Sequence, residues 1–169
     1  VIESGKICEG TVCYTGDIDD PDRAKYDLKY YVDMAKQLEK AGAHILGLKD
    51  MAGLLKPAAA TRLITALKQE ISIPIHFHTH DTSGISAASV LAAAAAGVDA
   101  ADAAMDSFSG LTSQPNLGSI VAALKATDRN TGLDNATIRQ LSDYWELVRR
   151  QYMAFESDIR SGGIRSLPS

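Results

Sequence analysis

Three histidines alternate with other residues in the segment from Pro74 to Thr82, which reads Pro-Ile-His-Phe-His-Thr-His-Asp-Thr. Residues two apart on a strand point to the same face, so His76, His78 and His80 would form one column. The last two would reach the carboxyl end of the strand, where two imidazoles suit a divalent ion such as Zn²⁺ or Mn²⁺. A stripe of hydrogen-bonded histidines without a metal is the alternative. His76 lies deeper in the column and is expected in the core.

Lys49 is the second candidate, in the segment Gly-Leu-Lys-Asp-Met-Ala-Gly from Gly47 to Gly53. A lysine at a strand end can form a Schiff base, contact a phosphate or complete an ion pair. Its ammonium has no lone pair for a metal, whereas a carbamylated lysine would carry a carboxylate and could join the histidines. The residue's chemistry alone favours an ion pair.

Other polar residues carry weaker signals. Asp102 and Asp106 share one face of a strand-like run, and we expect them to bond nearby backbone or lysine. The sequence has no glycine-rich phosphate loop, nucleophile elbow or Cys-x-x-Cys motif, which leaves nucleotide and acyl-serine chemistry without support. Cys8 and Cys13 would face opposite sides of a strand and are expected to be reduced thiols.

Short strand-like runs alternate with longer helical runs, which indicates parallel β/α units. The predicted strands cover residues 10–14, 44–48, 73–80 and 98–104. Four helices are predicted between and after these strands. The first begins at Asp20-Pro21-Asp22 and stops at Gly42, the second begins at Pro57, and the other two cover residues 83–96 and 114–126. Polar side chains follow the carboxyl end of each strand, so chemistry is expected at Asp17, Lys49-Asp50, His78 to Asp81 and Asp106.

One long helix is predicted from Leu133 to Ser161, capped by Asp134, with an apolar stripe that extends the helical layer or forms an interface. Four β/α units are half of an eight-unit barrel, which needs about 200 to 250 residues. The 169 residues therefore form either an open four-stranded sheet or part of a larger barrel.

Composition narrows the class of protein. The chain has 46% hydrophobic and 22% charged residues, as ordinary globular domains do. Its net charge of −4, with no basic run, argues against a nucleic-acid partner. The longest apolar stretch, Val90 to Gly97, is too short to cross a membrane, and the first residues do not resemble a signal peptide. A cytoplasmic location is expected.

Several motifs together resemble the carboxyltransferase domain of pyruvate carboxylases. They are Glu9 to Ile18, Leu48 to Leu54, Pro74 to Gly84, Asp102 to Asp106 and Thr112 to Pro115. The resemblance runs from Val1 to about Ser161. Related transcarboxylases and oxaloacetate decarboxylases share the Lys-Asp-Met-Ala-Gly and His-x-His motifs but are less similar elsewhere.

The resemblance implies a partial (β/α)₈ TIM barrel. Residues 1–132 would be barrel units four to seven, 133–161 would lead toward a helical funnel, and 162–169 depart from the family pattern. It also implies a divalent metal, Zn²⁺ or Mn²⁺, held by carbamylated Lys49, His78 and His80. A first-strand aspartate, the pyruvate-binding arginine and glutamine, and a proton-relaying threonine have no counterpart here.

The implied reaction is transfer of CO₂ from carboxybiotin to pyruvate, which yields oxaloacetate. Biotin would arrive on a carrier domain outside this segment, and the other implied partners are the rest of the barrel and further copies of the chain. A eukaryotic parent would place the protein in the mitochondrial matrix. The segment alone is expected to be inactive. The alternatives are a non-catalytic half-barrel or assembly module, or a piece of a related decarboxylase or transcarboxylase.

Overall fold

The structure is a computed structural model that describes residues 1–22 and 24–156. Its strands are β1 (Glu9–Cys13), β2 (Ile45–Asp50), β3 (Ile75–Thr79) and β4 (Ala100–Ala101). Its α-helices are α1 (Leu28–Lys40), α2 (Pro57–Glu70), α3 (Ser86–Ala95), α4 (Leu117–Leu124) and α5 (Asn135–Gln151). Short 3₁₀ helices are η1 (Ile2–Ser4), η2 (Ala24–Tyr26), η3 (Asp106–Phe108) and η4 (Met153–Phe155).

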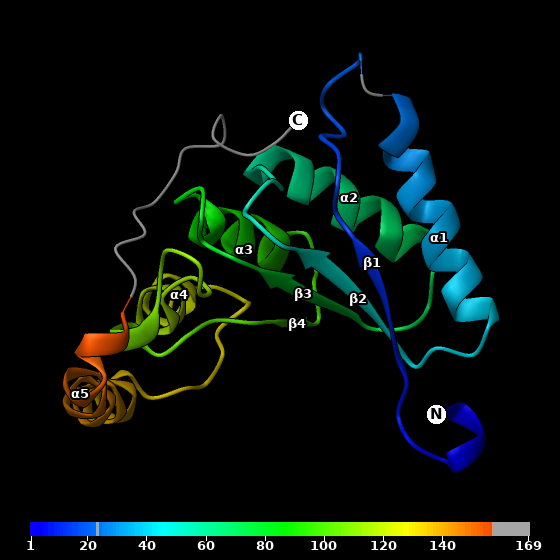
Figure 1. The fold of residues 1–169 in the computed structure, drawn as a ribbon. Helices are drawn as coiled ribbons and strands as arrows, with labels where there is room; N and C mark the ends of the chain where they lie inside the picture. The colour runs from blue at the N-terminus through cyan, green and yellow to red at the C-terminus, as the bar shows by residue number, and fades with distance from the viewer. Residues whose placement is uncertain (23, 157–169) are drawn as a thin grey trace.

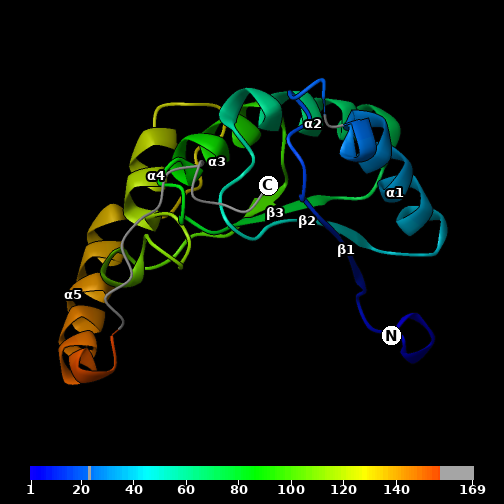
Figure 2. The same ribbon diagram turned by 45° about the horizontal axis from the view of Figure 1, so that its top comes forward.

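All four strands form one parallel sheet in the order β1-β2-β3-β4 (Figure 1). Helices α1, α2 and α3 cover one face of this sheet, whereas no helix of the described residues covers the opposite face, which we call the open face (Figure 2). The sheet ends at β1 on one side and at β4 on the other, so it does not close on itself. This open arrangement confirms the predicted β/α units and is that of a partial β/α barrel.

The core lies between the sheet and the helices. Leu46 and Leu48 of β2 and Phe77 of β3 pack with Leu63 and Ile64 of α2 in one buried cluster. Burial of each such side chain contributes about 1.5–3 kcal/mol of transfer free energy. The apolar residues of β2 and β3 therefore turn one face of the sheet toward the helices, and the residues between them face the open side.

Helix α1 begins later than predicted. The carboxylate of Asp27 accepts a hydrogen bond from the Tyr30 N–H at 2.8 Å and caps the helix. The expected cap at Asp20-Pro21-Asp22 is wrong, because the Asp20 carboxylate instead accepts from the Asp22 N–H in a local turn. Polar turns and η2 therefore occupy the start of the predicted helix.

Strand β4 is shorter than the predicted 98–104. Hydrogen bonds of strand type extend from the Asp99 N–H, donated to the Ile75 carbonyl, to the Asp102 N–H, donated to the Phe77 carbonyl. Beyond Asp102 the chain turns away and forms an isolated bridge with Asn116, which caps α4. The sheet therefore has a narrow edge at β4.

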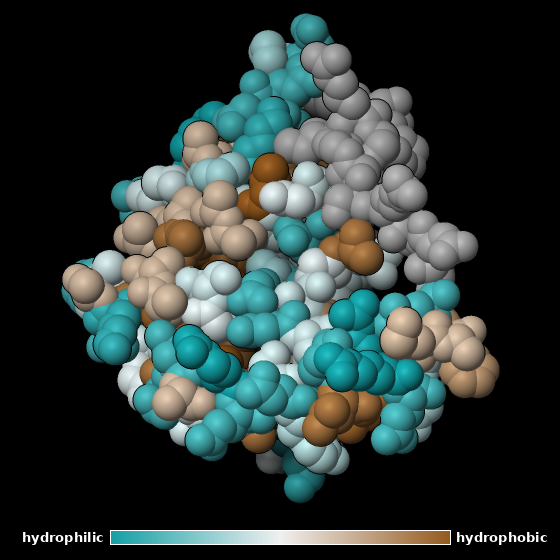
Figure 3. Space-filling view, turned by 90° about the vertical axis from the view of Figure 1, so that its left-hand side faces the viewer, coloured by the Kyte–Doolittle hydropathy of each residue, from teal (hydrophilic) through white to brown (hydrophobic). Residues whose placement is uncertain are grey.

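Asp134 caps α5, as predicted, by accepting a hydrogen bond from the Thr137 N–H at 2.8 Å. The helix ends at Gln151 rather than at 161, since η4 follows it, and residues 157–161 lie outside the described residues. The face of the molecule seen in Figure 3 mixes hydrophobic with hydrophilic residues. Large apolar side chains remain exposed on α5, including Tyr144, Trp145 and Leu147.

Two smaller observations complete the fold. Cys8 and Cys13 are free thiols, in line with the sequence analysis. Over residues 1–22 and 24–156, no helix combines the length and the apolar character that a bilayer crossing requires.

Candidate functional site

The site lies on the open face of the sheet, where β2 and β3 end. Lys49 on β2 is the register partner of His78 on β3, so their side chains project from adjacent strands to the same face. Both residues line a hollow of about 240 Å³. The other residues around this hollow are Glu9, Thr11, Gly47, Leu48, His76 and Asp102.

His78 and His80 form a close pair. Their Nε2 atoms lie 3.0 Å apart. The Nδ1 atom of His78 lies 2.6 Å from the Asp102 carboxylate, and the Nδ1 atom of His80 lies 2.6 Å from the Thr112 carbonyl oxygen. Since a carboxylate and a carbonyl only accept hydrogen bonds, each Nδ1 is the donor. In neutral rings both Nε2 lone pairs then meet, an arrangement that a shared cation stabilises.

This geometry fits a transition-metal ion. Two nitrogen ligands about 2.1 Å from one ion lie about 3.4 Å apart at the tetrahedral angle and about 3.0 Å apart at the right angle of an octahedral site, so the separation seen here is near the octahedral value. Metal-binding histidines usually donate their other ring N–H to a carboxylate or carbonyl, as His78 and His80 do here. The part of the chain that the structure describes holds no cluster of three His, Cys, Asp or Glu side chains suited to a metal. Among the described residues, a further ligand would therefore be of another kind, and Lys49 is the register partner of His78.

Lys49 makes no ion pair with any described residue, so the expectation of one is wrong. The carboxylates that share its hollow, Glu9 and Asp102, are already bonded to histidines. Within residues 1–22 and 24–156, its amine thus has no paired carboxylate beside His78. Carbamylation would convert that amine into an anionic oxygen ligand.

His76 is not a core residue, contrary to the prediction. Ile75 and Phe77 occupy the buried face of β3, so strand alternation places His76 on the open face, partly exposed. Its Nδ1 lies 3.1 Å from a Glu9 carboxylate oxygen and its Nε2 lies 3.0 Å from Asp102. Burial lowers the pKa of His76, but the hydrogen bonds to Asp102 and Glu9 outweigh this and raise its pKa above the ordinary value.

Asp102 connects His76 with His78, since one of its carboxylate oxygens bonds to each of these histidines. The expectation that it bonds backbone or lysine is therefore wrong, because the extended chain after β4 carries it to the histidine face. Burial raises the pKa of Asp102, yet the bonds to His78 and His76 outweigh burial and hold it below the usual range. Asp106 does bond backbone, as predicted, by accepting from the Gly118 N–H at 2.8 Å.

The remaining polar residues at the strand ends make contacts with the neighbouring loops and helices. Asp50 is fully buried and accepts hydrogen bonds from the Leu54 and Leu55 N–H groups, both at 2.9 Å. Asp17 pairs with Lys56, and Asp81 accepts from the Ser86 N–H. These contacts shape the loops around Lys49 and His80.

Sequence reasoning missed the partners of the histidines, namely Glu9 and the carbonyl of Thr112. Glu9 shares strand parity with Thr11 and Cys13, whereas Val12 points to the core. The charge of Glu9 was the available signal, because a charged side chain on the same face of the strand as Thr11 needs a partner. For Thr112 the contact is made by backbone, and residue identity carries no such signal.

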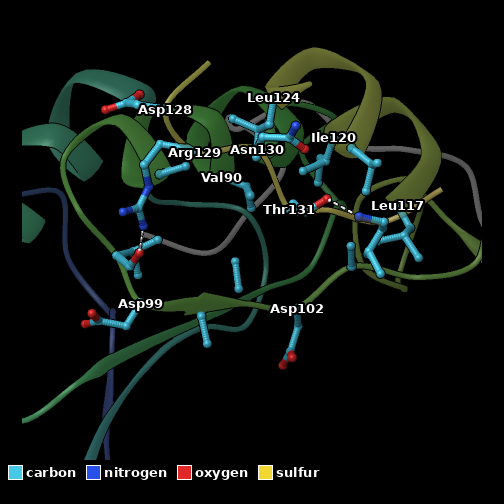
Figure 4. Close-up of a pocket in the computed structure, with 17 residues that line it drawn as sticks. Val90, Asp99, Asp102, Leu117, Ile120, Leu124, Asp128, Arg129, Asn130 and Thr131 are labelled. Atoms are coloured by element: carbon cyan, nitrogen blue, oxygen red, sulfur yellow. Dashed lines mark hydrogen bonds between the residues drawn. The ribbon is translucent and has the colours of Figure 1, made fainter. Parts of the chain in front are cut away.

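A second hollow lies elsewhere, beside β4 and between α3 and α4 (Figure 4). It measures about 440 Å³, and Val90, Ile120 and Leu124 give it an apolar wall. Asp102 borders it, but its carboxylate points away from these side chains in Figure 4. The hollow follows the open edge of the sheet and holds none of the histidines.

Comparison with known proteins identifies the family. The HMGL-like family model matches residues 17–144. Pyruvate carboxylase of Bacillus subtilis is 53% identical over 161 residues, which are 95% of this chain and 14% of that protein. Mouse mitochondrial pyruvate carboxylase is 49% identical over 162 residues, 94% of this chain and 14% of its own length.

Solved structures agree with these relatives. The carboxyl transferase domain of Rhizobium etli pyruvate carboxylase superimposes with a TM-score of 0.94 at 64% identity, over 96% of this chain and 27% of that one. The same domain solved with pyruvate and biocytin gives the same score and coverage. The chain thus spans about one seventh of its curated relatives. It belongs to the HMGL-like family, and its homologues are pyruvate carboxylases, to whose carboxyltransferase domain it corresponds in part.

Proposed function

We propose that the chain is the part of a biotin-dependent carboxyltransferase that holds the metal, in an enzyme that transfers CO₂ from carboxybiotin to pyruvate. The observation that carries this proposal is the 3.0 Å approach of the His78 and His80 Nε2 atoms, with both Nδ1 atoms already bonded to acceptors. The similar domain solved with pyruvate and biocytin supports the choice of substrate and carrier group.

The proposed metal ligands are His78, His80 and Lys49 as its carbamate, with Zn²⁺ or Mn²⁺ as the ion. Carbamylation joins the neutral amine nitrogen of Lys49 to the carbon of CO₂ and releases the amine proton. The product is a carboxylate, which suits either ion. Such an ion, when bound, supplies Lewis-acid polarisation of the substrate oxygen on which negative charge develops.

The chain's own residues prepare this site. Asp102 and the Thr112 carbonyl hold the two Nδ1 protons, so that both Nε2 lone pairs are presented. Asp50 holds the loop that follows Lys49. When bound, carboxybiotin would supply CO₂ and, after its release, a base for a methyl proton of pyruvate, so that the enolate carbon of pyruvate could bond to CO₂ and give oxaloacetate. The groups that relay this proton and bind pyruvate belong to the remainder of the barrel.

Two surfaces of the chain are suited to partners in the complete enzyme. The rest of the barrel would pair with the open edges of the sheet at β1 and β4, and the apolar hollow beside β4 supports an added element there. The exposed apolar side chains of α5 support contacts with further domains or with a second copy of the chain. We propose residues 1–132 as barrel and 133–161 as the approach to a helical funnel. The compartment would be the mitochondrial matrix in a eukaryote and the cytoplasm in a bacterium; the mouse relative is named as mitochondrial.

A hybrid enzyme tests the function. In Bacillus subtilis pyruvate carboxylase, the matching segment is replaced by the 161 aligned residues of this chain. We expect the hybrid to retain its metal through dialysis and to form oxaloacetate from pyruvate. The His78→Ala hybrid should lose both properties, while Glu70→Gln, which changes an exposed partner of Lys36, should lose neither.

An assembled hybrid without metal or activity would overturn the proposal, as would a His78→Ala hybrid that keeps both. Should the hybrid fail to assemble, the chain itself is titrated with Zn²⁺ by calorimetry. Weak binding that His78→Ala and His80→Ala both abolish is then the expected result. Binding that neither substitution changes would exclude this pair as the metal site.

A further inference from the structure

A line of hydrogen bonds crosses the open face of the sheet from β1 to the residue after β4. The Glu9 carboxylate lies 3.1 Å from Nδ1 of His76, and Nε2 of His76 lies 3.0 Å from Asp102. The other oxygen of Asp102 lies 2.6 Å from Nδ1 of His78. We call Glu9, His76 and Asp102 the relay network. It ends on the ring nitrogen of His78 that faces away from His80.

The network depends on a gap on the open face of β2, where Gly47 has no side chain. Gly47 is the register partner of both Thr11 on β1 and His76 on β3, so it lies between Glu9 and its partner. A Cβ atom at Gly47 would be 2.5 Å from Oε1 of Glu9 and 2.8 Å from Oγ1 of Thr11. No φ in the left-handed region requires a glycine there. The absent side chain therefore serves to let the Glu9 carboxylate pass over β2.

Different kinds of group orient the rings of His78 and His80. His80 donates its Nδ1 proton to a loop carbonyl, that of Thr112, whereas His78 depends on a side chain, that of Asp102. Asp102 could rotate about its own side-chain bonds unless its second oxygen is held, and His76 holds it. Glu9 in turn fixes the ring of His76. The orientation of His78 is thus set by contacts that reach back to β1.

We infer that the relay network, together with the gap at Gly47, positions His78 for metal binding. This inference rests on the proposed function, because it assigns a role toward the same ion. Glu9, His76 and Asp102 act through His78 and are positioning residues. Loss of a partner of this kind typically weakens metal binding about 10- to 100-fold.

The experiment measures metal dissociation constants of the hybrid enzyme with a chelator competition assay. Asp102→Asn should weaken binding about 10- to 100-fold. Glu9→Gln and Gly47→Ala should each weaken it by a smaller factor. The double variant Gly47→Ala/Glu9→Ala should be no weaker than Glu9→Ala alone, since both changes remove one contact. Glu70→Gln is the matched carboxylate control on an exposed helix end and should leave the constant unchanged.

A second readout separates positioning from general structure. In apo protein labelled with ¹⁵N-histidine, the His78 ring should show protonated Nδ1 in the parent and a mixture of tautomers in Asp102→Asn. Lower melting temperatures with unchanged metal constants and tautomers would overturn the inference. Glu9→Gln alters only a partly exposed side chain on the edge strand. If the other variants do not assemble, the metal constant and the His78 tautomer of this variant test the inference.

The two proposals fail in different ways. A parent hybrid that binds no metal would remove the proposed function and this inference together. A parent hybrid that loses its metal only in His78→Ala, and keeps its affinity in Asp102→Asn and Glu9→Gln, would leave the function standing and refute the relay network alone.

Discussion

Replacement of Asp50 by alanine should destabilise the chain strongly. Asp50 is fully buried, and its carboxylate accepts from the Leu54 and Leu55 N–H groups at 2.9 Å and from the Thr79 hydroxyl at 3.1 Å. The Thr79 hydroxyl has a second acceptor in Ser86. The Ala52 N–H also donates to Asp50, at a longer 3.4 Å, so the main loss is that of the two close bonds to the Leu54 and Leu55 amides. Each unpaired buried donor costs about 1–3 kcal/mol, which gives about 2–6 kcal/mol in total.

That loss is comparable to the whole stability of many domains, about 5–15 kcal/mol. Asp50→Asn keeps one acceptor oxygen and should cost about half as much. The assay is urea unfolding of the chain followed by far-ultraviolet circular dichroism at one fixed protein concentration, since self-association shifts apparent stability. Asp33→Asn, which removes only an exposed pair with Lys29, is the control and should cost less than about 1 kcal/mol.

A loss below about 1 kcal/mol for Asp50→Ala would refute this reasoning. It would mean that water or a rearranged loop satisfies the amides of Leu54 and Leu55. In the hybrid enzyme the same substitution should also lower metal retention, because the loop that Asp50 holds begins at Met51, two residues after Lys49.

Three further outcomes are expected. Lys49→Arg in the hybrid should lower metal retention measured by mass spectrometry, because a guanidinium cannot form a carbamate, and unchanged retention would exclude Lys49 as a ligand. Burial raises the pKa of Asp99, but hydrogen bonds from the Ile75 N–H and Lys68 outweigh burial and lower this pKa. Ionised Asp99 therefore stabilises the fold above about pH 4, the pKa of an unfolded aspartate, and this stabilisation is lost as the pH falls through the folded pKa. Asp99→Asn should flatten this acid limb in urea titrations, and an unchanged limb would contradict the assignment. The isolated chain, with two open strand edges, should self-associate in light scattering and show no pyruvate carboxylation, and a stable active monomer would contradict both expectations.

Local signals predicted the elements well where one residue decides the outcome. Pro57 opens α2 and Asp134 caps α5 because a fixed φ or a single carboxylate acts on the next turn. The start of α1 was mispredicted, since several aspartates could cap it. In the structure Asp27 is the cap, and the hydroxyl of Tyr31 accepts hydrogen bonds from the Thr15 and Gly16 N–H groups and so joins the preceding loop to the helix.

Spacing along the chain was enough to predict that the strands are parallel and that His76, His78 and His80 share one face. Which face that is, and what the histidines contact, depends on how the strands and helices pack. Glu9 meets His76 across 67 residues of chain, and Asp102 meets His78 across 24. Contacts at such separations depend on strand register, and register is set by the packing of the whole sheet against its helices.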